Sequence, residues 1–296
     1  MLEPPQDVDD AAVLAALAAG WGVRAGRADY LPVGAGSHHW TADGLFLKVD
    51  RESAAVRRSL ETARALRLDF VLAPLPTRDG GILQPVAPGW TMAAFPLVDG
   101  VAGEFGPHPP EDRPEIAAML TELHRSTPRV AHLAPRIALR LPGRNDLLTA
   151  LAESDRPWTS GPQAEPARAL LRRHADRLHG WLADFDRLTA TLPPPDAWVV
   201  THGEPHPGNV LRTADGLTLI DWTTVGIAPP DRDLWMLTDA FADLATPVRE
   251  PSPVAFYQLG WILADVAAFT ADLRRPHGDG PDEAAALRYL GGYLEG

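Results

Sequence analysis

The stretch that decides the fold is residues 198–222, which read WVVTHGEPHPGNVLRTADGLTLIDW. Apolar runs at Val199–Val200 and Leu217–Ile220 have the character of buried strands, and the pair Asp215-Gly216 is typical of a hairpin turn. The polar residues therefore fall at strand ends, on loops that a rigid scaffold would hold. Such loops are where proteins tend to place catalytic groups.

Three side chains in these loops are of the types that phosphoryl transfer requires. Glu204, Asn209 and Asp221 follow one another in that order. One carboxylate is needed to orient or accept the proton of an attacking hydroxyl, and an amide oxygen and a second carboxylate can hold Mg²⁺ against nucleotide phosphates. We predict that Glu204 is the base and that Asn209 and Asp221 are catalytic residues that bind the metal. The alternative is a loop and hairpin with incidental polar residues.

Length and composition are those of a soluble globular protein with room for two lobes. The chain has 296 residues, of which 45% are apolar and 22% charged, and it has no cysteine, which excludes disulfides and thiolate metal sites. The net charge of -12 argues against a nucleic-acid partner, because neutralising phosphates takes Lys and Arg. It suits a cationic small molecule, although many soluble proteins are acidic simply to remain soluble.

The sequence also bears on the location of the protein. The apolar run Val13–Leu17 follows an acidic start, whereas a secretory signal would need a basic one. We find no apolar stretch in the sequence that is long enough to span a membrane. A cytoplasmic protein with no membrane partner is therefore expected.

A second set of residues predicts where nucleotide phosphates would bind. Of the 27 basic residues only Lys48 is a lysine, and it lies on the expected strand 45–49. An ammonium is a compact point charge that suits a tight pocket against a diphosphate. Gly34, Gly36 and Ser37 precede it in a loop whose backbone N–H groups could approach an anion closely. A plain tight turn, with the single lysine placed by chance, is the alternative.

The remaining N-terminal elements would complete a nucleotide site. We expect helices at 8–19 and 52–68 and strands at 70–75, 81–86 and 90–97. Glu61 in the second helix could pair with Lys48, although a solvated Glu61 beside Arg57 or Arg64 is nearly as good an interpretation. Met92 would line the nucleotide pocket, or else fill the core. Exposed backbone groups around Ala94 would bind the adenine edge.

The rest of the chain is expected to be mainly helical. The apolar periodicity predicts helices at 114–126, 144–153, 166–191, 231–244, 253–274 and 282–294. Acidic side chains in the last third, Asp239, Asp265 and Asp272, could face a substrate or lie on the surface.

The order of these motifs resembles the aminoglycoside phosphotransferase family, the small-molecule kinases related to protein kinases. The segments that carry the resemblance are VGAGSHHW (33–40), THGEPHPGNVL (201–211), LIDW (219–222) and PPDRDLW (229–235). The resemblance implies an α+β, protein-kinase-like fold of two lobes. An N-lobe with an antiparallel β-sheet would span residues 1–97, and a mainly helical C-lobe would span residues 98–296.

The resemblance also implies a role for each matching residue. Lys48 would bind the nucleotide phosphates with Glu61 as its partner, and Asn209 and Asp221 would ligate Mg²⁺. Asp233 would brace the catalytic loop through hydrogen bonds to its backbone. The histidine of the His-Gly pair, His202, would be structural, and His206 is expected to be a surface histidine of the loop.

The sequence departs from the family pattern at the base. The family has aspartate after His-Gly, whereas this chain has Glu204, whose carboxylate is one methylene further from the backbone. The loop could adjust, the chemistry could tolerate the change, or the protein could be a weak or inactive relative. We expect a phosphotransferase that uses ATP and Mg²⁺ on a hydroxyl of a cationic small molecule, first an aminoglycoside or aminocyclitol and second an amino alcohol or amino sugar. A nucleotide-binding protein without catalysis is the rival.

Overall fold

The computed structural model describes residues 3–33 and 36–295. The chain divides into two compact units, one of Met1–Ile137 with Trp198–Asp233 and one of Ala138–Ala197 with Leu234–Gly296. We call them unit 1 and unit 2 and describe each by itself. They do not test the predicted lobe boundary between residues 97 and 98, which stays a prediction.

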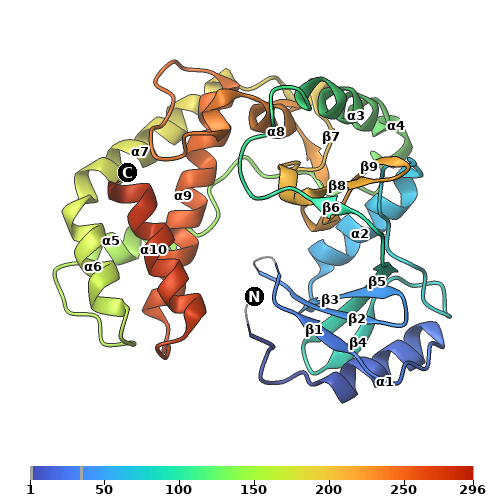
Figure 1. Cartoon of the computed structure of the whole chain (residues 1–296). Helices are drawn as coiled ribbons and strands as arrows, with labels where there is room; N and C mark the ends of the chain where they lie inside the picture. Colours follow the sequence, from blue (N-terminus) through green and yellow to red (C-terminus); the bar gives the residue numbers. More distant parts are fainter. Residues whose placement is uncertain (1–2, 34–35, 296) are drawn as a thin grey trace. The chain divides into compact units, whose positions relative to one another are not determined.

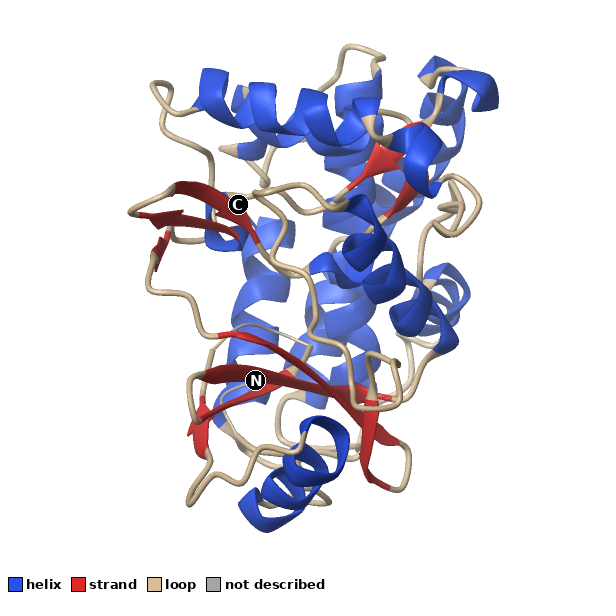
Figure 2. Cartoon of the chain, turned by 90° about the vertical axis from the view of Figure 1, so that its right-hand side faces the viewer, coloured by secondary structure: helices blue, strands red, loops and turns tan. Residues whose placement is uncertain are grey.

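Unit 1 contains all the strands of the described residues and several helices (Figures 1 and 2). Its strands are β1 (Asp29–Leu31), β2 (His38–Ala42), β3 (Leu45–Arg51), β4 (Gln84–Ala87), β5 (Trp90–Pro96), β6 (Val101–Ala102), β7 (Val199–Thr201), β8 (Val210–Thr213), β9 (Gly216–Leu219) and β10 (Gly226–Ala228). Its helices are α1 (Asp10–Trp21), α2 (Ala54–Leu66), α3 (Arg113–Arg125) and α4 (Thr127–Val130), with the short 3₁₀ helices η3 (Pro207–Asn209) and η4 (Trp222–Thr224).

The main sheet of unit 1 has five antiparallel strands in the order β1-β2-β3-β5-β4. This confirms the predicted antiparallel sheet and the α+β, kinase-like class. Side chains alternate between the two faces of a strand. One face packs against α1 through Leu17, with Trp40 and Leu47 from the sheet. The other face meets α2 through Leu60, which packs with Phe95.

A second group of short strands in unit 1 carries the predicted catalytic stretch. Strands β6, β8 and β9 form one small sheet, and β7 pairs with β10. The β8–β9 hairpin turns at residues 214–215, one residue before the predicted Asp215-Gly216 pair. Gly216, the first residue of β9, takes a φ of 124°, which a residue with a side chain rarely adopts. Figure 1 shows this group next to α2 and α3.

Unit 2 is a group of helices around α9. Its helices are α5 (Arg144–Ala152), α6 (Ala164–Arg173), α7 (Ala175–Leu188), α9 (Pro253–Arg274) and α10 (Pro281–Glu295), and short helical turns are η1 (Thr189–Thr191), η2 (Pro195–Ala197), η5 (Trp235–Leu237) and η6 (Asp239–Phe241). The four-residue α8 (Asp231–Leu234) lies at the boundary of the two units. One apolar core joins α5, α6, α7, α9 and α10, with Leu259 and Leu263 of α9 among its buried members. A second, smaller core holds Trp235, Met236 and Phe241 of η5 and η6.

Helix α9 corrects one expectation from the sequence. At 22 residues it is long and apolar enough to cross a membrane, by length and composition only. Half of its most apolar window is buried inside the protein, as is usual for the core helix of a soluble protein. The helix also carries Asp265 and Asp272, which a lipid environment would disfavour.

Three predicted elements differ in the structure. Residues 70–75 are not a strand, and only Val71 makes an isolated bridge, to Leu219. The predicted helix 166–191 is two helices, α6 and α7, that break at His174. The predicted helix 231–244 is a series of short turns, α8, η5 and η6.

Candidate active site

All the residues predicted for the site belong to unit 1. The centre is the loop of residues 202–209, which leaves β7 and ends in η3. We call it the 202–209 loop. Gly203 adopts a φ of 101°, and a Cβ placed there would lie 2.2 Å from the guanidinium of Arg232. The backbone conformation therefore favours glycine after His202, and a larger residue would also displace the Arg232 guanidinium.

Asp233 holds the start of this loop. Its carboxylate is fully buried and accepts hydrogen bonds from the backbone N–H of His202 (3.1 Å) and of Gly203 (2.6 Å). His124 of α3 donates a third hydrogen bond from Nε2 at 2.8 Å. Burial alone would raise the pKa of Asp233, but the hydrogen bond and charge of His124 outweigh it and hold the pKa below its usual range. This confirms that Asp233 braces the loop.

His202 is a structural residue, as predicted. The ring is fully buried, and its Nε2 lies 2.8 Å from the carbonyl oxygen of Ile220. The backbone N–H of Glu204 donates to Nδ1 at 3.2 Å. Because a carbonyl can only accept and an N–H can only donate, Nε2 carries the proton of a neutral ring. Burial lowers the pKa of His202, which keeps the ring in this state.

The far end of the loop is closed by Asn209. Its Nδ2 donates to the backbone oxygen of Glu204 at 2.9 Å and to Nε2 of His206 at 3.2 Å. This fixes the orientation of the amide, so Oδ1 is the atom of Asn209 that can bind a cation. His206 is half-buried rather than a surface residue as expected, and burial with nearby His202 and His108 lowers its pKa to about 4.

A backbone hydrogen bond connects the residue before Asp221 to Asn209. The N–H of Ile220 donates to the backbone oxygen of Asn209 at 2.9 Å. Asp221 itself has φ 59° and ψ 69°, the left-handed conformation, which costs free energy for a residue with a side chain. Strain of this kind persists at functional sites where the surrounding structure fixes it.

Lys48 contacts Asp221 directly. The Nζ of Lys48 donates to Oδ1 of Asp221 at 2.6 Å and lies 3.4 Å from the hydroxyl of Thr223. Burial would raise the pKa of Asp221, but the ammonium of Lys48 and hydrogen bonds from Lys48 and Thr223 outweigh it and lower the pKa. Lys48 is 5% exposed and Asp221 37% exposed, so the carboxylate remains accessible from one side.

The predicted phosphate loop is described in part. Gly34 lies outside the described residues. Gly36 has a φ of 80°, the left-handed conformation that glycine adopts readily. Ser37 is buried, and its hydroxyl donates to Oδ1 of Asp50 at 2.5 Å.

The predicted ion pair between Lys48 and Glu61 is wrong. Among the ion pairs of the described residues, the partner of Lys48 is Asp221, and none joins Lys48 to Glu61. Ser59 lies on the side of α2 that contacts residues 222–225. Its hydroxyl donates a hydrogen bond to the carbonyl oxygen of Val225 at 3.3 Å. Glu61 falls on a different side of the helix and lines a hollow with Ile82. Helical phase therefore turns Glu61 away from Lys48.

The strand register decides between the two expected roles of Met92, whereas the expected role of the backbone around Ala94 stays a prediction. Lys48 is directly opposite Ala93 on β5, so Ala93 shares its face of the sheet. Met92 and Ala94 are fully buried on the other face, in the core with α1. The backbone oxygen of Ala94 accepts from the N–H of Leu75 at 2.7 Å. Met92 is thus a core residue.

Several supporting residues escaped prediction from the sequence. His108, buried in the 97–112 segment, has its Nε2 2.6 Å from the carbonyl oxygen of Pro205, and Gly103 N–H donates to the carbonyl of Pro207 at 3.0 Å. His124 is a further supporting residue, through its hydrogen bond to Asp233. No local pattern marks these positions, because their partners lie about a hundred residues away.

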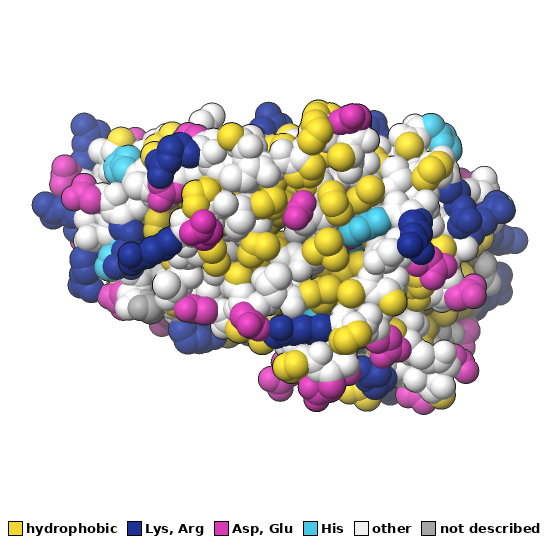
Figure 3. Space-filling view, turned by 90° about the horizontal axis from the view of Figure 1, so that it is seen from above, with side chains coloured by type: hydrophobic (Ala, Val, Ile, Leu, Met, Phe, Trp, Pro, Cys, Tyr) yellow, Lys and Arg dark blue, Asp and Glu magenta, His cyan; other side chains and the backbone are white. Residues whose placement is uncertain are grey.

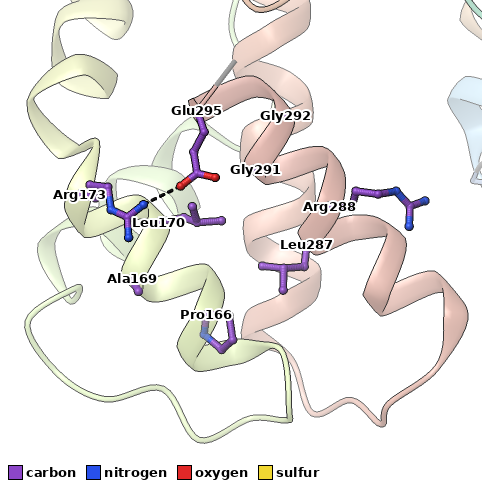
Figure 4. Close-up of a pocket in the computed structure, with 9 residues that line it drawn as sticks. All are labelled: Pro166, Ala169, Leu170, Arg173, Leu287, Arg288, Gly291, Gly292 and Glu295. Atoms are coloured by element: carbon purple, nitrogen blue, oxygen red, sulfur yellow. Dashed lines mark hydrogen bonds and ion pairs between the residues drawn. The ribbon is translucent and has the colours of Figure 1, made fainter.

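Two hollows of the described residues are lined by none of the predicted catalytic residues. A hollow of about 710 Å³ in unit 2 lies between α6 and α10, where Arg173 pairs with Glu295 at 2.6 Å (Figure 4). Its walls are apolar at Leu170 and Leu287. None of the predicted catalytic residues lines it, so we assign it no part in the chemistry.

Comparisons with known proteins agree with the motifs. The model of the phosphotransferase enzyme family (APH) matches residues 36–252. Protein StrN of Streptomyces griseus is 30% identical over 282 residues, which covers 90% of this chain and 86% of StrN. The family match covers Gly36, Lys48 and the 202–209 loop together.

Solved structures share the fold at low sequence identity. The spectinomycin phosphotransferase APH(9)-Ia, in complex with ADP and spectinomycin, has a TM-score of 0.75 and 15% identity over 96% of this chain and 94% of its own. A microcompartment-associated aminopropanol kinase has a TM-score of 0.54 and 20% identity over 96% and 95%. Fold, motifs and relatives agree that the chain belongs to the phosphotransferase enzyme family and is a small-molecule kinase.

Proposed function

We propose that this protein transfers the γ-phosphoryl group of Mg·ATP to a hydroxyl of a small cationic molecule in the cytoplasm. An aminoglycoside or aminocyclitol is the first candidate, and an amino alcohol or amino sugar is the second. The observation that carries the proposal is the 2.6 Å contact of Lys48 with Asp221, which brings the only lysine of the chain to the predicted metal ligand.

The metal half of the site fits magnesium. Mg²⁺ in kinases takes one or two protein oxygens and completes its shell with phosphates and water. Asp221, with its lowered pKa, offers a carboxylate that is ionised at neutral pH, and Asn209 offers Oδ1. When bound, the metal would neutralise the charge that develops on the transferred phosphoryl group. Lys48 would then exchange its bond with Asp221 for one with the nucleotide phosphates.

Glu204 is proposed as the base. Both of its backbone polar groups are bonded within the loop, through His202 and Asn209, so the direction in which its side chain leaves the backbone is fixed. The carboxylate would accept the proton of the substrate hydroxyl as the oxygen attacks phosphorus. Phosphoryl transfer depends mainly on positioning and charge neutralisation, which tolerates a base of altered length if the substrate is placed to match.

A cationic substrate is favoured by charge. The net charge is -12, and the face drawn in Figure 3 intersperses acidic with basic side chains, which leaves no continuous basic track there for a nucleic-acid backbone.

The names of the relatives favour each of the two substrate classes. The spectinomycin phosphotransferase is in complex with spectinomycin, and APH(4)-Ia, in complex with ADP and hygromycin B, has a TM-score of 0.57 with 14% identity. The aminopropanol kinase favours the second class. At these identities the structures carry the fold alone, so the choice rests on assay.

The test is release of ADP in the presence of Mg·ATP, with a panel of aminoglycosides, aminocyclitols, amino alcohols and amino sugars. Acceptor-dependent turnover is expected for one class and should fall by about 10²–10⁴-fold in Glu204→Ala. Glu61→Ala is the matched carboxylate control and should keep the wild-type rate, because Glu61 has no ion pair with Lys48 in the structure. Turnover that is unaffected by Glu204→Ala would remove the assignment of the base. Nucleotide binding without turnover on any acceptor would favour the non-catalytic rival.

A further inference from the structure

The sheet face that carries Lys48 has a regular layout of side chains. His39 of β2 is directly opposite Lys48 of β3, and Lys48 is opposite Ala93 of β5. Asp50, two residues along β3, shares the same face because side chains alternate along a strand. The ammonium of Lys48 therefore has His39 across the strand pair and Asp50 beside it along the strand.

Asp50 holds one end of the glycine loop. Its Oδ1 accepts the hydroxyl hydrogen of Ser37 at 2.5 Å. Ser37 is 7% exposed and directly follows Gly36. A hydroxyl has one hydrogen to donate, so Ser37 cannot give the same hydrogen to a phosphate while it bonds Asp50.

His39 holds the other end. Its Nδ1 lies 3.0 Å from the backbone oxygen of Val33, and because a carbonyl only accepts, Nδ1 carries the proton. The ring is buried and stacks on Phe46 with the ring centres 5.1 Å apart and the planes at 29°. Burial and the charge of Lys48 lower the pKa of His39 to about 4, which keeps this ring neutral at neutral pH.

Both contacts involve side chains on the sheet face of Lys48, the lysine that would bind the phosphates. We propose that Asp50 and His39 are positioning residues of the nucleotide site, which act by fixing Ser37 and Val33 at the two ends of the glycine loop. The inference rests on the proposed function, because it concerns the affinity of the same nucleotide site.

The physical reason is preorganisation. When the two ends of a loop are fixed before the nucleotide arrives, less conformational entropy is lost on binding, so the affinity is higher. A carboxylate next to a phosphate site is otherwise unfavourable, because like charges repel. We infer that the hydrogen bond between Ser37 and the Asp50 carboxylate outweighs this repulsion. Neighbouring Lys48 also reduces the repulsion.

The experiment is titration calorimetry of the whole chain with Mg·ADP and with a non-hydrolysable Mg·ATP analogue, neither of which needs a known acceptor. Asp50→Ala should raise the nucleotide Kd about tenfold, the change that corresponds to one hydrogen bond. Asp50→Asn keeps an acceptor for Ser37 and loses the negative charge, so its Kd should stay within about twofold of wild type or fall. His39→Ala should weaken binding, and His39→Asn, which keeps an N–H donor, should restore it in part.

A double-mutant cycle separates positioning from direct contact. If Ser37 acts through Asp50, the Ser37→Ala/Asp50→Ala double variant should bind as Asp50→Ala alone does. Independent, additive effects would mean that Ser37 bonds the phosphate directly and would overturn the inference. Glu52→Ala, an exposed carboxylate two residues beyond Asp50, is the matched control and should bind as wild type does.

The remaining outcomes separate this inference from the proposed function. A wild-type chain that binds no nucleotide would overturn the proposed function and the inference with it. A wild-type chain that binds, with an unchanged Kd in Asp50→Ala, would overturn the inference alone. Thermal unfolding without nucleotide shows whether each variant is folded. Should Asp50→Ala fail to fold, Ser37→Ala removes the same hydrogen bond and must weaken binding, and a wild-type Kd in that variant contradicts the inference.

Discussion

At residue 204 the length of the side chain matters because the backbone is fixed on both sides. The N–H of Glu204 is bonded to His202 and its carbonyl to Asn209, while Pro205 is held through His108. A loop with this many anchors cannot shift to compensate for a shorter side chain. Two explanations were open for a glutamate at this position: an adjusted loop, or a substrate that binds where the longer side chain can reach it. The fixed backbone favours the second.

The corresponding prediction concerns Glu204→Asp. Restoring the family residue should lower kcat by about 10- to 100-fold, because a base displaced by about 1 Å loses its alignment with the hydroxyl. The nucleotide Kd should not change. Steady-state ADP release and calorimetry on the same samples measure the two quantities. A rate equal to or above wild type would mean that the loop, and not the substrate, sets the geometry.

The residue scale also shows what the sequence could and could not predict. Lys48, Asn209 and Asp221 were identified because their types and order match the chemistry. The roles of Met92 and Glu61 were misassigned because each role depends on phase, that is, on the side of the strand or helix from which the side chain leaves. A shift of one residue moves a strand side chain to the other face. That phase is set by the register with neighbouring strands and by helix rotation, which a single sequence does not specify.

Among the elements, the 202–209 loop depends most on Asp233. Removing this carboxylate would leave the N–H groups of His202 and Gly203 buried without their acceptor, together with Nε2 of His124. Asp233→Ala should therefore lower the free energy of unfolding by about 3 kcal/mol and abolish turnover. Urea unfolding measures the first effect. Asp231→Ala, two residues earlier, is the control that should lie close to wild type, and equal stabilities of the two variants would contradict the role of Asp233.

Element boundaries were predictable where residues mark them and not elsewhere. Asp9 caps α1, and the pair Asp215-Gly216 marks the hairpin turn to within one residue; both signals are visible in the sequence. The break at His174 between α6 and α7 and the extended conformation of Thr238, with ψ 166°, have no glycine or proline to mark them. In the 70–75 segment, an apolar run suggested a strand, but proline 74 removes a donor that a strand would need.

For the molecule as a whole, the single lysine makes a chemical test possible. An amine-reactive acyl phosphate of ATP should label Lys48 as the only side-chain amine of the chain, since the ammonium is directed toward the metal ligand Asp221. Peptide mass spectrometry locates the label, and excess Mg·ADP should prevent it. Labelling that excess nucleotide leaves unchanged would mean that Lys48 lies outside the nucleotide site.

Stability should depend on pH through the buried histidines. The pKa of His39 is lowered from 6.5 to about 4, so between these values the unfolded chain binds a proton that the folded chain does not. Stability then rises with pH across this window and is lost as the pH falls from 7 toward 4. The free energy of unfolding of the wild-type protein, measured in urea, should be lower at pH 5 than at pH 7. In His39→Asn the difference between the two pH values should be smaller. The same decrease in both proteins would exclude a contribution of His39.

The central claim is that the chain phosphorylates a small cationic alcohol, and mass spectrometry of the acceptor after incubation with Mg·ATP tests it most directly. We predict that one class of aminoglycoside, aminocyclitol or amino alcohol gains a single phosphoryl group on a hydroxyl, and that Glu204→Ala, with its nucleotide Kd unchanged, produces none. Acceptors of unchanged mass throughout the panel, with wild-type protein that binds Mg·ATP, would contradict the claim.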